Sequence, residues 1–245
     1  DLDFVFLGPE SAVTEFVGWA QGKGLKIRSR VPEDHEDLSK GVELWDLLSL
    51  LDGEALTSKG EKILERERLK IVLASTAQKK KWLKQLLVER KARHERYDSI
   101  QNLLEPSIKM GLGGLRDLDQ ARLILKSFPE IEIEDPHVLR LLDYYLQAFL
   151  WIRCKLHLEG QRDLISNQSQ PQLAEFFRFS DYREFMFFVQ RGLSRVSFYT
   201  DWILEIACRG QRRAEFKELK KPGDLTRALL HDSGVLTKYS VRRLL

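Results

Sequence analysis

Asp1 and Asp3 open the chain two positions apart, at the start of the apolar run Phe4 to Leu7. If this run forms a β-strand, alternation of side chains along the strand places both carboxylates on one face. Two like charges held this close repel each other, and a divalent cation relieves the repulsion. Carboxylate oxygens suit Mg²⁺, which also binds nucleotide phosphates. The Asp-x-Asp pattern therefore indicates a metal site, while a solvated strand end gives the same pattern.

The segment from Lys109 to Asp117 could do a second kind of chemistry. Three glycines within four positions let the backbone approach a ligand closely. The segment leads into a helix expected to end near Lys126, and the first amides of a helix point toward an anion. Lys109 and Arg116 bracket the loop with two cations. The spacing matches neither the dinucleotide fingerprint nor the phosphate loop, so both a phosphate-contacting loop and a flexible hinge fit it.

Several elements must position these groups. The first thirty residues read as strand, helix and strand, over residues 4–7, 11–21 and 25–31. After Pro32 the pattern is almost entirely helical, with helices expected over residues 42–51 and 63–73 and around residues 82–87. One further short strand is expected near residues 131–133. The fold class predicted from the pattern is α+β, mostly α.

Two long helices follow. The first begins at Asp135-Pro136, because aspartate caps free amides and proline fits the first helical position. Its apolar residues form one continuous stripe: Val138, Leu142, Tyr145, Phe149, Ile152 and Leu156. The second begins at the capping-box pattern Asp181 to Glu184 and ends near Gly210. We expect both helices to be elements of a bundle, with Trp151 and Trp202 packed between helices.

Composition excludes several classes of protein. With 43% apolar and 31% charged residues over 245 positions, the chain is typical of a folded globular protein. Its longest uncharged run, residues 164–174, is far shorter than the roughly 20 apolar residues that span a bilayer. The two cysteines, Cys154 and Cys208, lie within apolar helical patterns, so we expect buried, reduced thiols in a cytoplasmic protein. The chain opens without methionine, and we expect it to be part of a longer one.

Positive charge is concentrated in the middle of the chain. The net charge is only +3, yet residues 59–97 contain thirteen Lys and Arg against five Glu. This excess could attract phosphates or an acidic partner, or form an ordinary solvated helix face. Trp82 is the one aromatic residue that interleaves the cluster, which argues against a nucleic-acid platform.

The motifs together resemble a known family. Glu105-Pro106-Ser107-Ile108-Lys109, followed by Gly113-Gly114-Leu115-Arg116-Asp117, is similar to the glycine-rich signature of the uridylyltransferases that modify the PII nitrogen-signal protein. The helical region of that family is matched in order and spacing by Phe149-Leu150-Trp151, Arg153, Leu156-His157, Arg162-Asp163 and Gln170. The opening residues 1–7 resemble the metal-binding strand of the same family.

The resemblance implies an architecture and a set of site residues. A remnant of a polymerase-β-type nucleotidyltransferase sheet would occupy residues 1–104, an all-helical bundle domain residues 105–222, and a helical linker residues 223–245. Asp1, Asp3 and Glu43 would be catalytic and bind Mg²⁺ or Mn²⁺, with Asp117 an alternative third carboxylate. Nucleotide contacts would come from Lys109, Gly113, Gly114, Arg116 and Asp117. The triphosphate-gripping turn of the family would lie upstream of Asp1.

The implied activity is transfer of a nucleoside monophosphate, expected to be UMP, from a nucleoside triphosphate to a PII-like regulatory protein. The expected partners are therefore the triphosphate and a PII-like protein, with neither a membrane nor a specific nucleic acid. Met110 and Leu112 stand where an acidic residue and a proline are usual in the family. The alternative is accordingly a catalytically degenerate interaction or regulatory module of the same fold.

Overall fold

The computed structural model describes residues 2–6, 10–30, 44–97, 104–133, 135–209 and 213–214. The chain divides into two compact units, Asp1–Ala74 and Ser75–Leu245. Most of the described residues are helical, as the sequence predicts. The predicted boundaries at residues 104 and 222 divide the chain into a nucleotidyltransferase-like region, a helical domain and a linker, and they stay predictions.

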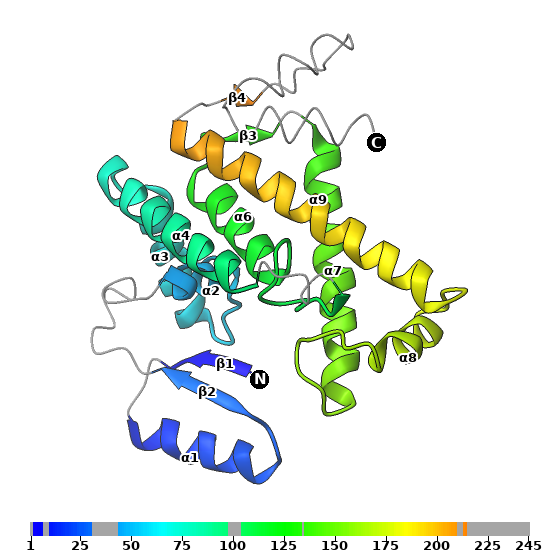
Figure 1. Cartoon of the computed structure of the whole chain (residues 1–245). Coiled ribbons are helices and arrows are strands. Elements are labelled where there is room, and N and C mark those ends of the chain that lie inside the picture. Colours follow the sequence, from blue (N-terminus) through cyan, green and yellow to red (C-terminus); the bar gives the residue numbers. More distant parts are fainter. Residues whose placement is uncertain are drawn as a thin grey trace. The chain divides into compact units, whose positions relative to one another are not determined.

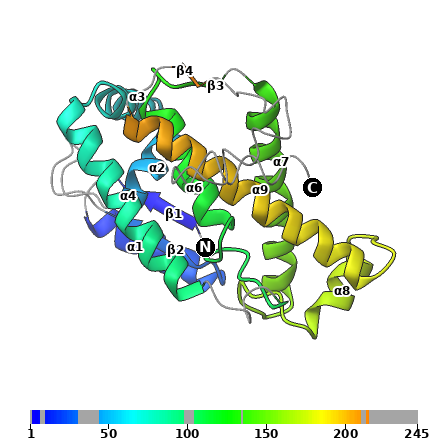
Figure 2. The same cartoon turned by 45° about the horizontal axis from the view of Figure 1, so that its top comes forward.

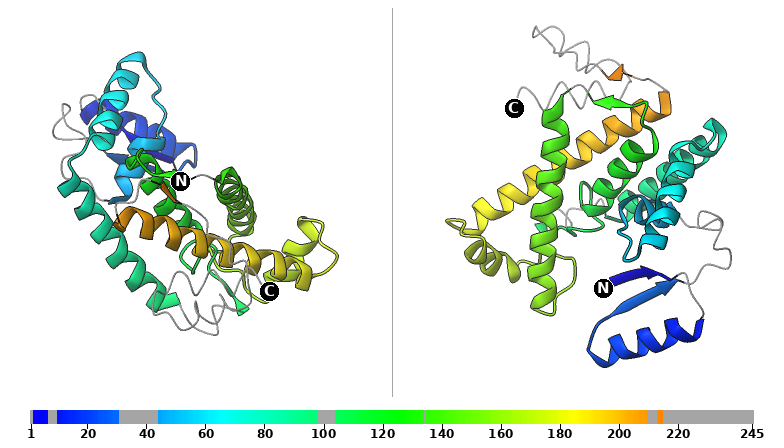
Figure 3. Two further views of the ribbon diagram at one scale, coloured as in Figure 1. Left: turned by 90° about the horizontal axis from the view of Figure 1, so that it is seen from above. Right: turned by 180° about the vertical axis from the view of Figure 1, so that it is seen from behind.

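The first unit opens with the predicted strand, helix and strand: β1 (Leu2–Val5), α1 (Glu10–Gly22) and β2 (Ile27–Arg30). The two strands pair in parallel, with Asp3 in register with Arg28. Helix α1 packs against β2 (Figure 3), because a parallel pair needs a crossover and the helix supplies it. Phe16 of α1 contacts Phe4 and Phe6 edge to face, with ring centroids 5.8 and 5.5 Å away.

Two helices complete this unit. α2 (Leu44–Asp52) packs against α3 (Ser58–Val72) and buries four leucines, Leu47, Leu48, Leu50 and Leu51. Thr57 caps α3 by accepting a hydrogen bond from the Gly60 amide. Arg68 closes the turn between the helices, since its guanidinium donates to the carbonyls of Leu50 and Gly53.

The second unit is a helical bundle built around α9 (Tyr182–Arg209). This helix contacts α4 (Thr76–Tyr97), α6 (Leu115–Ser127), α7 (Pro136–Leu158) and α8 (Ser169–Phe176), and Figures 1 and 2 show it crossing α6 and α7. The largest side chains with no exposed surface include Phe149 of α7 and Phe185 of α9. Burial of each such side chain stabilises the fold by about 1.5–3 kcal/mol.

The predicted start signals of the two long helices are confirmed. Asp135 accepts a hydrogen bond from the His137 amide, with Pro136 in the first turn of α7. All six residues of the predicted α7 stripe are buried. At α9, Asp181 accepts from the Glu184 amide at 2.8 Å. The Glu184 carboxylate reaches back to the Ser180 amide and hydroxyl, one residue earlier than the capping-box pattern specifies.

Some expectations about the second unit are wrong. Helix α8 lies in a stretch that the polar composition of residues 164–174 left unassigned. The short strand β3 (Glu132–Ile133) is present, but its parallel partner β4 (Arg213–Ala214) was not foreseen. Cys154 and Cys208 are exposed, and so is Trp151, at 64%. The apolar pattern of a long helix does not by itself give the rotation of each residue about the helix axis. The sequence therefore did not show that these three side chains are exposed.

No helix in the described part of the chain combines the length and hydropathy needed to cross a membrane. The predicted linker, residues 223–245, lies outside the described residues.

Candidate functional site

The glycine-rich loop folds back on the helix that it introduces. The amides of Leu115 and Arg116, which open α6, donate to the carbonyls of Ile108 and Lys109 at 2.9 and 3.0 Å. The expectation that these amides point at an anion is therefore wrong, because the preceding loop already occupies them. The loop therefore caps the N-terminus of α6 through its own carbonyl groups.

Gly113 brings this cap against α9. Its φ is +73°, a backbone conformation that favours glycine, and a Cβ atom here would lie 1.7 Å from the Leu193 carbonyl oxygen. Its amide donates to Oδ2 of Asp117 at 2.7 Å. Glycine at this position is thus required by contact between backbones, which fixes the loop on the bundle and excludes the hinge interpretation at Gly113.

Asp117 is the centre of a buried ion network. Its side chain has no exposed surface, and its Oδ1 lies 2.5 Å from Nη1 of Arg90 and 2.7 Å from Nη2 of Arg93. Nε2 of His94 lies 3.1 and 3.2 Å from the two carboxylate oxygens. All three partners belong to α4, which places them on one helix face at positions 90, 93 and 94.

The network continues through Gln120, one turn further along α6. Its Oε1 accepts from Arg90 at 3.3 Å, and its Nε2 donates to Glu89 at 2.7 Å. Arg90 also reaches Asp201 of α9 at 3.0 Å, and the Thr200 hydroxyl donates to the Asp117 carbonyl. Polar contacts therefore join α4, α6 and α9 in the interior of the bundle.

The electrostatics of this network favour the ionised form of Asp117. Burial alone would raise the pKa of the Asp117 carboxyl, but its hydrogen bond to His94 and the charges of Arg90 and Arg93 hold the pKa well below its ordinary value. Burial likewise opposes the charge of Arg93, and the neighbouring Asp117 carboxylate still raises the pKa of its guanidinium. The buried charges are thus matched in sign and position.

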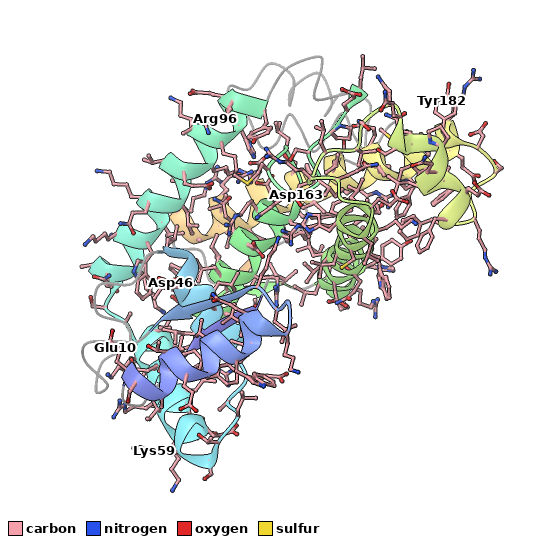
Figure 4. The ribbon with its side chains drawn as sticks, turned by 90° about the horizontal axis from the view of Figure 1, so that it is seen from below. Glu10, Asp46, Lys59, Arg96, Asp163 and Tyr182 are labelled. Carbon is pink, nitrogen blue, oxygen red and sulfur yellow. The ribbon has the colours of Figure 1, made fainter. Side chains whose placement is uncertain are left out.

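The opposite end of the loop is partly exposed and carries a second cluster. Asp163 follows α7, as labelled in Figure 4, and its Oδ1 accepts from Nε of Arg153 and lies near Nε2 of His157, both at 2.7 Å. The Asp163 carbonyl accepts from the Ile108 amide at 2.8 Å. This hydrogen bond places Lys109, the next residue, beside the cluster, where its charge acts on Asp163.

Asp163 holds two side chains of α7, those of Arg153 and His157, in place. Burial would raise the pKa of Asp163, but the hydrogen bonds from Arg153 and His157 and the charges of Arg153 and Lys109 hold it below its ordinary value. The Arg153 side chain is 31% exposed, and no other described residue bonds its guanidinium. The bond through Nε leaves the Nη atoms as further donors, so this partly exposed edge can bind an anion. We call Lys109, Arg153, His157 and Asp163 the α7 edge.

The structure separates the predicted nucleotide-binding residues. Lys109 belongs to the α7 edge. Gly113, Gly114 and Asp117 are buried, Gly114 as the N-cap of α6. Arg116 pairs with Asp119 at 3.5 Å. Contact of each with a nucleotide stays a prediction.

The predicted metal ligands belong to the first unit. Asp3 lies in β1, whose side chain at that position is not described, and Asp1 and Glu43 lie outside the described residues. Carboxylate oxygens on alternate strand positions are a donor set that fits Mg²⁺. Asp117 does not fit as the third ligand, because both of its oxygens are taken by buried protein donors. No cluster of potential metal ligands occurs among the described side chains.

Sequence reasoning missed the partners rather than the residues. The motif contains His157, but its spacing does not show that the partner of this side chain is Asp163 in the following loop. Sequence reasoning also gives Arg90 and Arg93 no role beyond the basic cluster, of whose described Lys and Arg residues they and Lys79 are the buried ones. The available signal was the joint occurrence of Arg153, His157 and Asp163 in one motif.

Comparison with known proteins gives concordant matches. A family model described as GlnD PII-uridylyltransferase matches residues 81–204, which include the loop, the ion network and the α7 edge. A bifunctional uridylyltransferase/uridylyl-removing enzyme of Erythrobacter litoralis is 30% identical over 209 residues, 75% of this chain and 22% of the relative. Its counterpart from Phenylobacterium zucineum is 31% identical over 207 residues, 74% of this chain and 21% of the relative. This chain thus spans about a fifth of the length of these relatives, and no solved structure matches it.

Proposed function

The chain belongs to the PII-uridylyltransferase family, and from this premise we propose that its protein transfers UMP from UTP to a PII-like regulatory protein in the cytoplasm. The observation that carries the proposal is the convergence of Lys109, Arg153 and His157 around Asp163, inside the region that the family model matches. A lysine and an arginine at one partly exposed edge are donors of the kind that bind the oxygens of a triphosphate.

The two buried features support this edge. The ion network of Asp117 and the contact of Gly113 with Leu193 fix the end and the middle of the loop on the bundle. The hydrogen bond from the Ile108 amide to the Asp163 carbonyl fixes the start of the loop, so Lys109 is held beside Arg153 before the ligand arrives. Prior positioning lowers the entropy lost on binding. Arg116 would contact the nucleotide from the other end of the same loop.

The first unit would supply the metal chemistry. The parallel β1 and β2 with their crossover helix would be a piece of the nucleotidyltransferase sheet, with Asp1, Asp3 and Glu43 holding Mg²⁺ or Mn²⁺. A bound divalent ion would neutralise triphosphate charge and activate the attacking hydroxyl. The role of the chain's own residues is to hold the ion and to bind the phosphate oxygens, Lys109 among them.

The direct test is UMP transfer by the full-length protein. PII is incubated with UTP and Mg²⁺, and its mass is followed by mass spectrometry. We expect modification with the wild-type protein, loss of at least about 100-fold in rate with Asp3→Asn, and a near wild-type rate with Asp46→Asn, a substitution in α2 of the same unit. Binding of PII without transfer would instead favour the degenerate interaction module, and equal rates in both variants would overturn the metal assignment.

A further inference from the structure

We propose that the outer face of α4 is a docking surface for an acidic surface of a protein partner, which under the proposed function is the PII-like acceptor. The face consists of Lys80, Lys81, Lys84, Leu87, Val88 and Lys91, all of them exposed. This inference rests on the proposed function for the identity of the partner only. The chemistry of the face is read from α4 itself.

The lysines of this face are poorly matched by their own helix. Among the described residues, Lys80, Lys81 and Lys84 form neither an ion pair nor a hydrogen bond. Lys91 has only Glu95, at 3.9 Å and with both side chains exposed. Lys79, beside them in sequence, points inward and pairs with Glu130 at 3.4 Å. The basic run is therefore divided between the bundle interior and a row of cations in solvent.

This row opposes the stability of the helix that carries it. The first turn of α4 contains no acidic residue that could offset the charge of the lysines that follow it. Lys80 and Lys84 are four residues apart, a spacing at which like charges cost about 0.2–0.5 kcal/mol. A helix face arranged against its own stability is typical of a surface selected for binding.

The centre of the face is apolar. Leu87 is 43% exposed and Val88 63% exposed, between Lys84 and Lys91. A protein surface can cover these side chains within a ring of ion pairs, the usual arrangement of apolar centre and polar rim. A nucleic-acid backbone leaves Leu87 and Val88 without a counterpart, and Glu95 on the same side repels phosphates. The combination favours an acidic protein.

The test measures binding of PII to the full-length protein by biolayer interferometry, at two ionic strengths. The docking variant is Lys80→Glu/Lys81→Glu/Lys84→Glu. Its matched control is Arg140→Glu/Arg183→Glu/Arg191→Glu, which makes the same change of charge at exposed positions of α7 and α9. We expect the docking variant to bind at least about tenfold more weakly, mainly through a slower association rate, and the control to bind within about threefold of wild type.

Two further readouts keep the inference distinct from folding and from the proposed function. The docking variant should melt close to the temperature of wild type, because all three substituted side chains are exposed. Its affinity for UTP, measured by calorimetry, should be unchanged. The inference would be overturned if the docking variant and the control bound PII equally, or if wild type did not bind PII. It would also be overturned if the docking variant lost affinity for duplex DNA and kept its affinity for PII. Absence of UTP binding by wild type would instead contradict the proposed function.

Discussion

Nη2 of Arg93 lies 2.7 Å from Oδ1 of Asp117, with both side chains almost completely buried. This ion pair joins the C-terminal part of α4 to the first turn of α6, next to the glycine-rich loop. Arg90 shares the same carboxylate oxygen, so two guanidinium groups meet at one buried anion. The position of the loop on the bundle therefore depends on the charge of Asp117.

Substitution of Asp117 by Asn should destabilise the bundle strongly. Loss of the negative charge leaves Arg90 and Arg93 buried without their shared partner, a change that typically costs about 3–5 kcal/mol. The measurement is the free energy of unfolding in urea at pH 7.

The matched control is Asp119→Asn, two residues further along α6. Asp119 pairs with Arg116 at 3.5 Å and is partly exposed, so its loss should cost less than about 1 kcal/mol. Similar small losses in both variants would show that Asp117 does not carry the network.

The Asp117 carboxylate should make the free energy of unfolding depend on pH. The native pKa of Asp117 lies below the value of about 3.9 expected in the unfolded chain. Its contribution to stability is therefore present above the unfolded pKa and is lost as pH falls through the native pKa.

We expect the urea midpoint of the wild-type protein to fall steeply below about pH 5, and that of Asp117→Asn, already lower at pH 7, to fall less over the same range. Parallel pH profiles for the two proteins would contradict the assignment. Asp163 shifts in the same direction but is partly exposed, so its substitution should flatten the profile less.

Gly113→Ala should be far more destabilising than Gly160→Ala. Both glycines have positive φ, +73° and +72°, so both substitutions carry a conformational cost of about 1–2 kcal/mol. Only at Gly113 does the added Cβ meet another backbone, since nothing lies within 4 Å of the corresponding atom at Gly160.

Thermal unfolding of the two variants provides the comparison. The additional overpacking at Gly113 should bring its total cost to about 3 kcal/mol or more. Equal shifts in melting temperature would mean that the loop does not press on the Leu193 carbonyl.

The Arg153→Lys variant should not retain the UTP affinity that Arg153 gives to the α7 edge. The arginine uses Nε to bond Asp163 and keeps its Nη atoms as further donors, whereas a lysine has a single amino group for both tasks. UTP affinity should fall several-fold in Arg153→Lys, and about as much in Arg153→Ala, as measured by calorimetry. If Arg153→Lys bound UTP as tightly as wild type, a single positive charge at position 153 would be sufficient for UTP binding.

Much of the bundle followed from residue patterns. The stripe of α7, its Asp135 cap and the start of α9 at Asp181 depend on local spacing, which a sequence displays directly. The roles of Arg90 and Asp117 could not be predicted in this way, because their contact joins residues 27 positions apart on different helices. Gly113 was expected to serve a ligand, since a sequence shows that a glycine is present but not which backbone approaches it.

Calorimetric titration of the full-length protein with UTP in the presence of Mg²⁺ tests the α7 edge most directly, using Lys109→Ala with Lys155→Ala as its control. Lys155 lies on another side of α7, where it pairs with Glu159 and covers Phe176. We predict that wild type and Lys155→Ala bind UTP with similar affinity, and that Lys109→Ala binds at least about tenfold more weakly, as expected when a charged hydrogen bond is lost. Equal affinity in all three proteins, or no binding of UTP by wild type, would contradict the account.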